Sequence, residues 1–153
     1  MTVDFEGFAK IPVIDCHIHF TDLEKVQQIL DVVSRADFHR VAVLSLATTR
    51  LTNAAGPNSN PEALVLKALH PETFYAFGSL DYFPLLRGNH SPSLSEQVDM
   101  LETIGFDGIK MVEGKPNARK SMGIKFDDTF YEDYFKSLEE KRGDEAENHY
   151  LAG

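Results

Sequence analysis

The stretch VIDCHIHF, residues 13–20, follows Pro12 as a short apolar-rich run, and this composition predicts a buried β-strand. Side chains two residues apart in a strand point to the same side, so Asp15, His17 and His19 share one face. The other, mostly apolar face is made by Ile14, Cys16, Ile18 and Phe20. We expect that face to pack on helices, which makes Cys16 a small core residue and not a nucleophile.

Along the rest of the chain, strands and helices alternate. Runs of β-branched and apolar residues predict three further strands, at residues 40–46, 74–80 and 107–112. Apolar residues at helical spacing predict four helices, at residues 22–36, 61–69, 93–104 and 127–141. This order is typical of an α/β fold in which right-handed crossovers join parallel strands and helices pack on the sheet.

The helix ends and loops carry signals of their own. Ser93 and Glu96 fit a capping box at the start of one helix, and Asn60 before Pro61 predicts the cap of another. Polar segments that contain Pro or Gly predict loops at residues 48–60, 81–92 and 113–125.

Composition limits the kinds of partner. The 153 residues suffice for one domain with a core, and a net charge of -9 argues against nucleic acid and anionic membranes as partners. No apolar run approaches the roughly 20 residues that cross a bilayer. With a single cysteine and an acidic N-terminus, the chain lacks a disulfide framework and a typical signal peptide, so we expect a cytoplasmic protein.

The histidine pair is the candidate metal site. Two imidazoles on one face of a strand can chelate a divalent ion, and imidazole suits zinc, iron, manganese or nickel. The alternative is a hydrogen-bonded pair without a metal. His17 and His19 end the first strand of a βα repeat, where catalytic residues of parallel barrels lie, and this position favours the metal site.

Three segments resemble the amidohydrolase superfamily. VIDCHIHF resembles its first barrel strand, in the branch that includes aminocarboxymuconate-semialdehyde decarboxylase-like metal-dependent hydrolases. HPETFYAF, residues 70–77, and GFDGIK, residues 105–110, are similar to the segments that lead into strands three and four of that branch. The resemblance covers about residues 11–116, the N-terminal half of such a barrel.

The resemblance implies a (β/α)8 TIM barrel with a divalent metal, zinc foremost, at the C-terminal ends of its strands. His17 and His19 would be metal ligands, and the substrate would be a small molecule that bears a carbonyl or carboxylate group. The implied reaction is hydrolysis of a C–N or C–O bond, with non-oxidative decarboxylation as the alternative. Some members have a carbamylated lysine where Lys110 ends the fourth strand.

For Lys110 we expect a catalytic-site role, the binding of a substrate carboxylate, with an ion pair to Asp15 or Glu113 as the alternative. The basic segment 115–120 follows the same strand and would bind an anionic substrate or lie solvated. The histidines that we expect at the surface, outside the site, are His39, His70, His90 and His149.

A complete barrel of this kind needs roughly 250 residues. We therefore assign residues 1–142 to a partial barrel domain of about four βα units and residues 143–153 to a polar tail. The family's later ligands, a histidine after strand five and an aspartate after strand eight, have no counterpart. The alternatives are a truncated or inactive half-barrel fragment and a homo-oligomer in which two copies form one barrel. A flavodoxin-like module is disfavoured because no Gly-rich phosphate loop follows the first strand.

Overall fold

The computed structural model describes residues 11–46, 58–111 and 115–144. Its four strands form one parallel sheet in the order β1-β2-β3-β4, as the alternation of strands and helices predicts. They are β1 (Val13–Ile18), β2 (Phe38–Leu44), β3 (Phe74–Ser79) and β4 (Gly108–Lys110). The chain is thus an α/β half-barrel of four parallel βα units.

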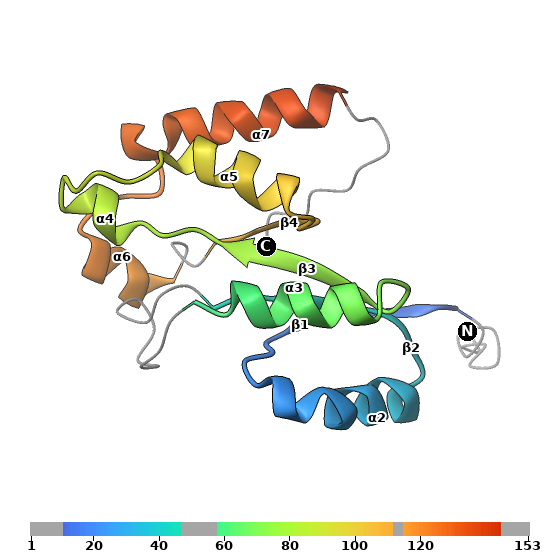
Figure 1. The fold of residues 1–153 in the computed structure, drawn as a ribbon. Coiled ribbons are helices and arrows are strands. Elements are labelled where there is room, and N and C mark those ends of the chain that lie inside the picture. Colours follow the sequence, from blue (N-terminus) through green and yellow to red (C-terminus); the bar gives the residue numbers. More distant parts are fainter. Residues whose placement is uncertain (1–10, 47–57, 112–114, 145–153) are drawn as a thin grey trace, which may run out of the picture.

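The helices cover the sheet and its ends (Figure 1). They are η1 (Leu23–Lys25), α2 (Val26–Ala36), α3 (Asn60–Leu69), α4 (Phe83–Leu86), α5 (Leu94–Thr103), α6 (Pro116–Met122), η2 (Thr129–Tyr131) and α7 (Glu132–Asp144). In the described ranges, none has both the length and the apolar content that crossing a bilayer requires. Residues 145–153, most of the predicted tail, lie outside the described ranges.

The two short helices α4 and α6 replace two of the predicted loops, so the loop predictions for residues 81–92 and 113–125 are wrong in these parts. Both helices carry a proline in the first turn, Pro84 and Pro116, where its missing N–H costs no intrahelical bond. Both lie at the end of the sheet toward which β3 points (Figure 1).

The helix caps agree with the sequence at one site and differ at another. The capping box of Ser93 and Glu96 is present at α5, with both reciprocal hydrogen bonds. At α3 the predicted cap is wrong, because the N-cap is Ser59 and Asn60 is the first helical residue. The amide of Asn60 instead bonds the backbone of Ser79 on β3, accepting from its N–H at 2.8 Å and donating to its carbonyl at 3.0 Å.

The C-terminal half of β2 and most of β3 are buried on both faces. Val41, Val43 and Ala76 belong to the main core, which also contains residues of α2, α3 and α5 and therefore marks the helix-covered face. The alternate residues of the same strands form a second, small cluster on the inner face: Ala42, Leu44 and Phe77, with Tyr75 packed against them. A strand buried on both faces is expected in a parallel sheet.

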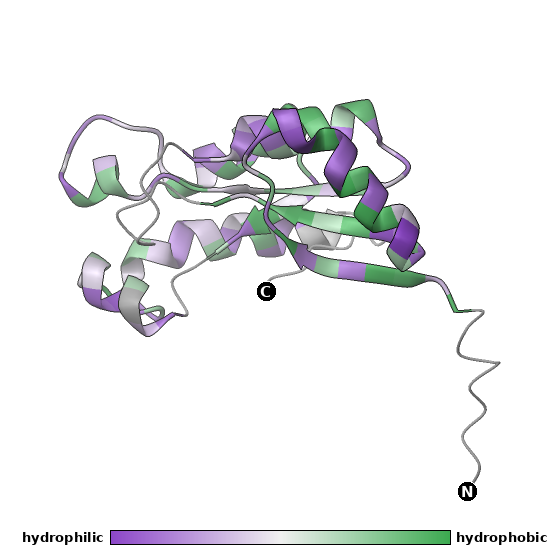
Figure 2. Ribbon diagram, turned by 90° about the horizontal axis from the view of Figure 1, so that it is seen from below, coloured by the Kyte–Doolittle hydropathy of each residue, from purple (hydrophilic) through white to green (hydrophobic). Residues whose placement is uncertain are grey.

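By contrast, β1 is an exposed edge strand. Val13 and Ile14 are 50% and 47% exposed, Cys16 is exposed, and Ile18 is half-buried. The prediction that Ile14 and Cys16 would pack on helices is therefore wrong. Its reason is positional: β1 pairs only with β2 in the described ranges, and α2 packs over β2. Figure 2 shows β1 as the outermost strand, leading out of the N-terminal segment.

We predict that Gly108→Ala destabilises the sheet. A Cβ at Gly108 would lie 2.7 and 2.8 Å from two ring carbons of Phe77, which is closer than carbon atoms pack. Because the ring is buried, we expect a loss of about 1–3 kcal/mol in the free energy of unfolding, measured with urea. In a Gly108→Ala/Phe77→Leu double variant, the smaller side chain makes room, so the loss should be less than the sum of the two single losses. Additive losses would contradict the contact.

Candidate metal centre

The two histidines of the first strand converge on one point. The Nε2 atoms of His17 and His19 lie 3.2 Å apart, and their rings are nearly perpendicular, at 86°. His17 lies in β1 and His19 directly follows it, so both stand at the C-terminal end of the strand. The structure thus brings together the two residues that the sequence predicts as metal ligands.

The ring of His19 is held by the neighbouring strand. Its Nδ1 lies 2.6 Å from the carbonyl oxygen of Leu44, the last residue of β2. A carbonyl only accepts hydrogen bonds, so Nδ1 carries the proton and Nε2 of the neutral ring has a bare lone pair. Metal-binding histidines are commonly oriented by a hydrogen bond of this kind.

The spacing of the two nitrogens fits a shared metal ion. Two nitrogens bound to tetrahedral zinc at roughly 2.0–2.1 Å are about 3.3–3.4 Å apart. The 3.2 Å between the Nε2 atoms of His17 and His19 is close to that value. Without a metal, Nε2 of His17 must donate a proton to Nε2 of His19, whose other ring nitrogen already donates to Leu44.

The described residues supply two ligands and no more. Catalytic zinc sites normally have three protein ligands. In residues 11–46, 58–111 and 115–144 there is no group of three or more His, Cys, Asp and Glu side chains placed to hold a metal. Asp15 is near the pair, but it does not form such a group with the histidines; its carboxylate accepts the backbone N–H of His17 at 2.9 Å and so stiffens the strand end.

The electrostatics of the site favour neutral imidazole at His17. The pKa of His17 lies below its ordinary value, first because partial burial disfavours the charged ring. The positive charge of Lys110 lowers this pKa further, as do His19 and Lys115, whereas Asp15 raises it. Neutral imidazole is the form that coordinates a metal.

Lys110 stands on the inner face of the sheet. A Cβ at Gly108 would face the inner-face residue Phe77, and side chains two residues apart share a face, so Lys110 faces the same way. Its side chain is buried, with 8% exposed, and it acts on His17. The structure therefore brings Lys110 into the electrostatic environment of His17. Glu113, its proposed alternative partner, lies outside the described residues.

The other predicted residues lie apart from this point. Segment 115–120 forms the start and first turns of α6, where Lys115, Arg119 and Lys120 are exposed, and among these cations Lys115 acts on His17. His39 and His90 are exposed, and His70 packs edge-on against Phe74. His149 lies outside the described residues. The role of the Leu44 carbonyl in orienting His19 was not predicted, because every residue has a backbone carbonyl and the sequence does not distinguish this one.

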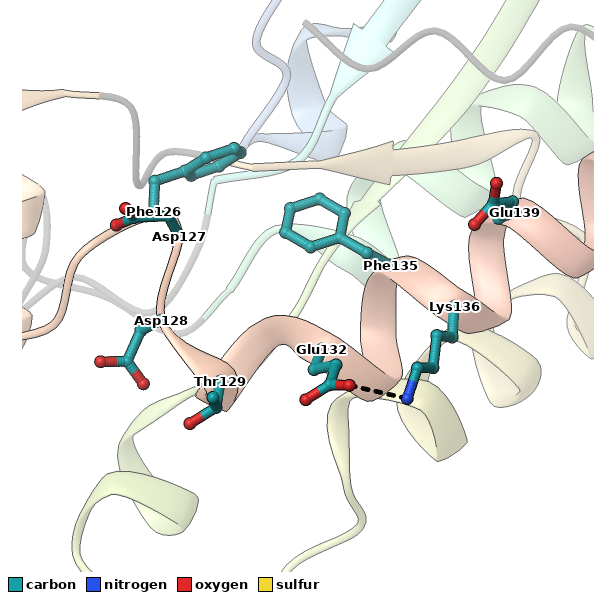
Figure 3. Close-up of a pocket in the computed structure, with 8 residues that line it drawn as sticks. All are labelled: Phe126, Asp127, Asp128, Thr129, Glu132, Phe135, Lys136 and Glu139. Carbon is teal, nitrogen blue, oxygen red and sulfur yellow. Dashed lines mark ion pairs between the residues drawn. The ribbon is translucent and has the colours of Figure 1, made fainter.

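A separate groove of about 340 Å³ lies between α7 and the segment that precedes η2, residues 126–128 (Figure 3). Two phenylalanines, Phe126 and Phe135, face each other across it, with ring centroids 5.4 Å apart. Its rim is acidic, and one of its carboxylates, Glu132, pairs with Lys136 at 2.8 Å. None of the predicted site residues lines it.

Comparisons with known proteins add no argument about function. No family model and no curated protein matches the chain. Among solved structures, it is similar to a probable 2-pyrone-4,6-dicarboxylic acid hydrolase from Acinetobacter baumannii, determined with citric acid bound. The identity is 14% and the TM-score 0.44, over 72% of this chain and 44% of the other. The match therefore spans less than half of that protein, and no activity follows from it.

We predict that Lys110→Met raises the pKa of His17 in the metal-free protein. Removing the positive charge removes a cause that holds this pKa below 6.5, so protonation becomes easier and the midpoint moves up. NMR titration of the imidazole signals measures the shift. Lys136→Met, which removes an exposed lysine of α7, is the matched control and should leave the midpoint unchanged. An unchanged midpoint in Lys110→Met would place the lysine out of reach of His17.

Proposed function

We propose that this chain carries half of the metal site of an amidohydrolase-superfamily enzyme, with His17 and His19 as ligands of a divalent ion, zinc foremost. The observation that carries the proposal is the convergence of the two Nε2 atoms, with the proton of His19 directed away to Leu44. This arrangement leaves the lone pair of His19 Nε2 available to a metal ion, as metal-binding histidines commonly do. The site also lies at the C-terminal ends of parallel strands, as in barrel enzymes.

The proposed reaction is hydrolysis of a C–N or C–O bond in a small molecule, with non-oxidative decarboxylation as the alternative. When bound, a divalent ion supplies Lewis acidity to a carbonyl or carboxylate oxygen. His17 and His19 hold that ion as neutral ligands. Lys110 binds a substrate carboxylate, since its ammonium group lies on the same face and forms strong hydrogen bonds to anions.

One observation favours a second candidate, a half-barrel that binds metal without turnover. The described residues hold two ligands, one fewer than catalytic zinc sites normally have. A third ligand would come from outside the described ranges, from a further segment of the protein, or from a second copy of the chain. Activity therefore has to be tested separately from metal binding.

We predict near-stoichiometric zinc in the purified protein and its loss in a His17→Ala/His19→Ala double variant. Removing both imidazoles removes every ligand that the described residues offer at this point. Elemental analysis after dialysis against micromolar zinc measures the ratio. A His39→Ala/His90→Ala double variant removes two exposed histidines elsewhere and should keep its zinc. Equal zinc in both double variants, or none in the wild type, would refute the metal site.

For substrates, we predict that Lys110→Met weakens binding of carboxylate-bearing compounds selectively. The test uses paired esters, lactones and amides that differ by one carboxylate. Loss of a hydrogen bond to a charged group should raise KM on the order of 10- to 100-fold for the carboxylate-bearing member of each pair. Lys110→Arg, which keeps the charge, should lose less. An equal rise of KM for both members would show that Lys110 does not bind the carboxylate.

A further inference from the structure

The position of His19 depends on a single peptide unit at the end of β2. The carbonyl of this unit belongs to Leu44 and accepts from Nδ1 of His19, and its N–H belongs to Ser45 and donates to the carbonyl of Phe77 at 2.9 Å. The last paired residue of β1 is Ile18, so the ring of His19 takes the next place along the β2 edge. Any movement of the end of β2 therefore moves the acceptor that orients His19.

Ser59 clamps the residues that follow this peptide unit. Its hydroxyl accepts the N–H of Leu46 at 2.7 Å, and its own N–H donates to the carbonyl of Leu46 at 3.1 Å. Its carbonyl accepts the hydroxyl of Ser45 at 3.3 Å. Ser59 is 4% exposed, so water does not replace these bonds freely. Three atoms of one buried serine thus hold the two residues directly after Leu44.

A second serine supports the same clamp. The hydroxyl of Ser79, at the end of β3, donates to the carbonyl of Leu46 at 3.2 Å. Asn60, the residue after Ser59, bonds both backbone groups of Ser79. The ends of β2 and β3 and the start of α3 therefore form one buried hydrogen-bonded unit.

The side chain of Ser59 does not cap the helix that it precedes. Ser59 is the N-cap residue of α3, yet its side chain makes no capping hydrogen bond. Ser93 at the start of α5 shows the ordinary role, since its hydroxyl accepts the N–H of Glu96. At α3, the hydroxyl that would cap the helix is directed to the end of β2.

We infer that Ser59 is a positioning residue for His19, an inference that rests on the proposed metal site. Its hydroxyl fixes Leu46 and, through the chain, the carbonyl of Leu44. This carbonyl keeps the proton of His19 on Nδ1 and directs the lone pair of Nε2 to the point shared with His17. Ser59 touches neither ring; it acts through the backbone.

The test compares two serine-to-alanine changes at helix N-caps, Ser59→Ala and Ser93→Ala. The readout is the tautomer of His19, taken from its ring ¹⁵N shifts in the metal-free protein at pH 8. Ser59→Ala should move His19 from the Nδ1–H form toward a mixture of tautomers. Ser93→Ala should lower stability without changing the tautomer, because its bonds stay within the start of α5. The conservative variant Ser59→Thr should restore the wild-type shifts.

The second readout is zinc affinity, measured by competition with a chelating dye. Loss of a group that orients a metal ligand weakens binding, and for Ser59→Ala we expect a decrease on the order of 10-fold. Ser93→Ala and Ser59→Thr should bind zinc as the wild type does. If Ser59→Ala does not fold, Ser59→Cys, which is nearly the same size and a poor acceptor, should give the same shift of tautomer.

Wild-type ¹⁵N shifts and zinc affinity in the folded Ser59→Ala or Ser59→Cys protein would overturn the inference. The same holds if the wild-type ring is not in the Nδ1–H form. These failures differ from failure of the metal site itself. If the wild type binds no zinc but Ser59→Ala changes the tautomer, the proposed function falls and the positioning role of Ser59 stands.

Discussion

The parallel pairing of β2 with β3 is the constraint on which the rest of the structure depends. In this pairing Val41 lies opposite Phe74 and Leu44 opposite Phe77, and side chains on both faces of this part of β2 are buried. Burying a side chain of this size stabilises the fold by roughly 1.5–3 kcal/mol. A shift by one residue would turn the helix-facing side chains to the inner face, so the register is strongly fixed. The same register decides which carbonyl of β2 meets His19.

The site joins this rigid centre to an exposed edge. His17 lies on β1, whose residues Val13 and Ile14 are about half exposed. Strands with few buried contacts open locally at low free energy. The bond from His19 to Leu44 ties this edge to the buried strand. The lowered pKa of His17 makes the folded state sensitive to acid. Below pH 6.5 the unfolded chain binds more protons at this residue than the folded chain does, so the stability of the folded state falls as the pH drops toward the folded pKa.

The sequence predicts the elements well because local signals and packing agree there. The four strands, their parallel order and the capping box at Ser93 all follow from spacing and residue type. The role of Asn60 was predicted wrongly, because its amide has a stronger tertiary use, the pairing with Ser79. Cys16 alternates with the histidines as predicted, yet it is exposed, since periodicity gives the face and not what covers it. The hydrogen-bond partner of His19 is a backbone carbonyl, which every residue has, so the pattern of residue types could not predict it.

The charges around the histidine pair set a requirement for whatever binds there. Two neutral imidazoles give a divalent ion no negative charge, and the nearby Lys110 and Lys115 oppose it. The carboxylate of Asp15 lies near, but it already accepts the N–H of His17. A cation bound at this point would therefore be stabilised by an anion beside it. An anionic third ligand, or the carboxylate of the proposed substrate, would supply that charge, and cation and anion would each favour the binding of the other.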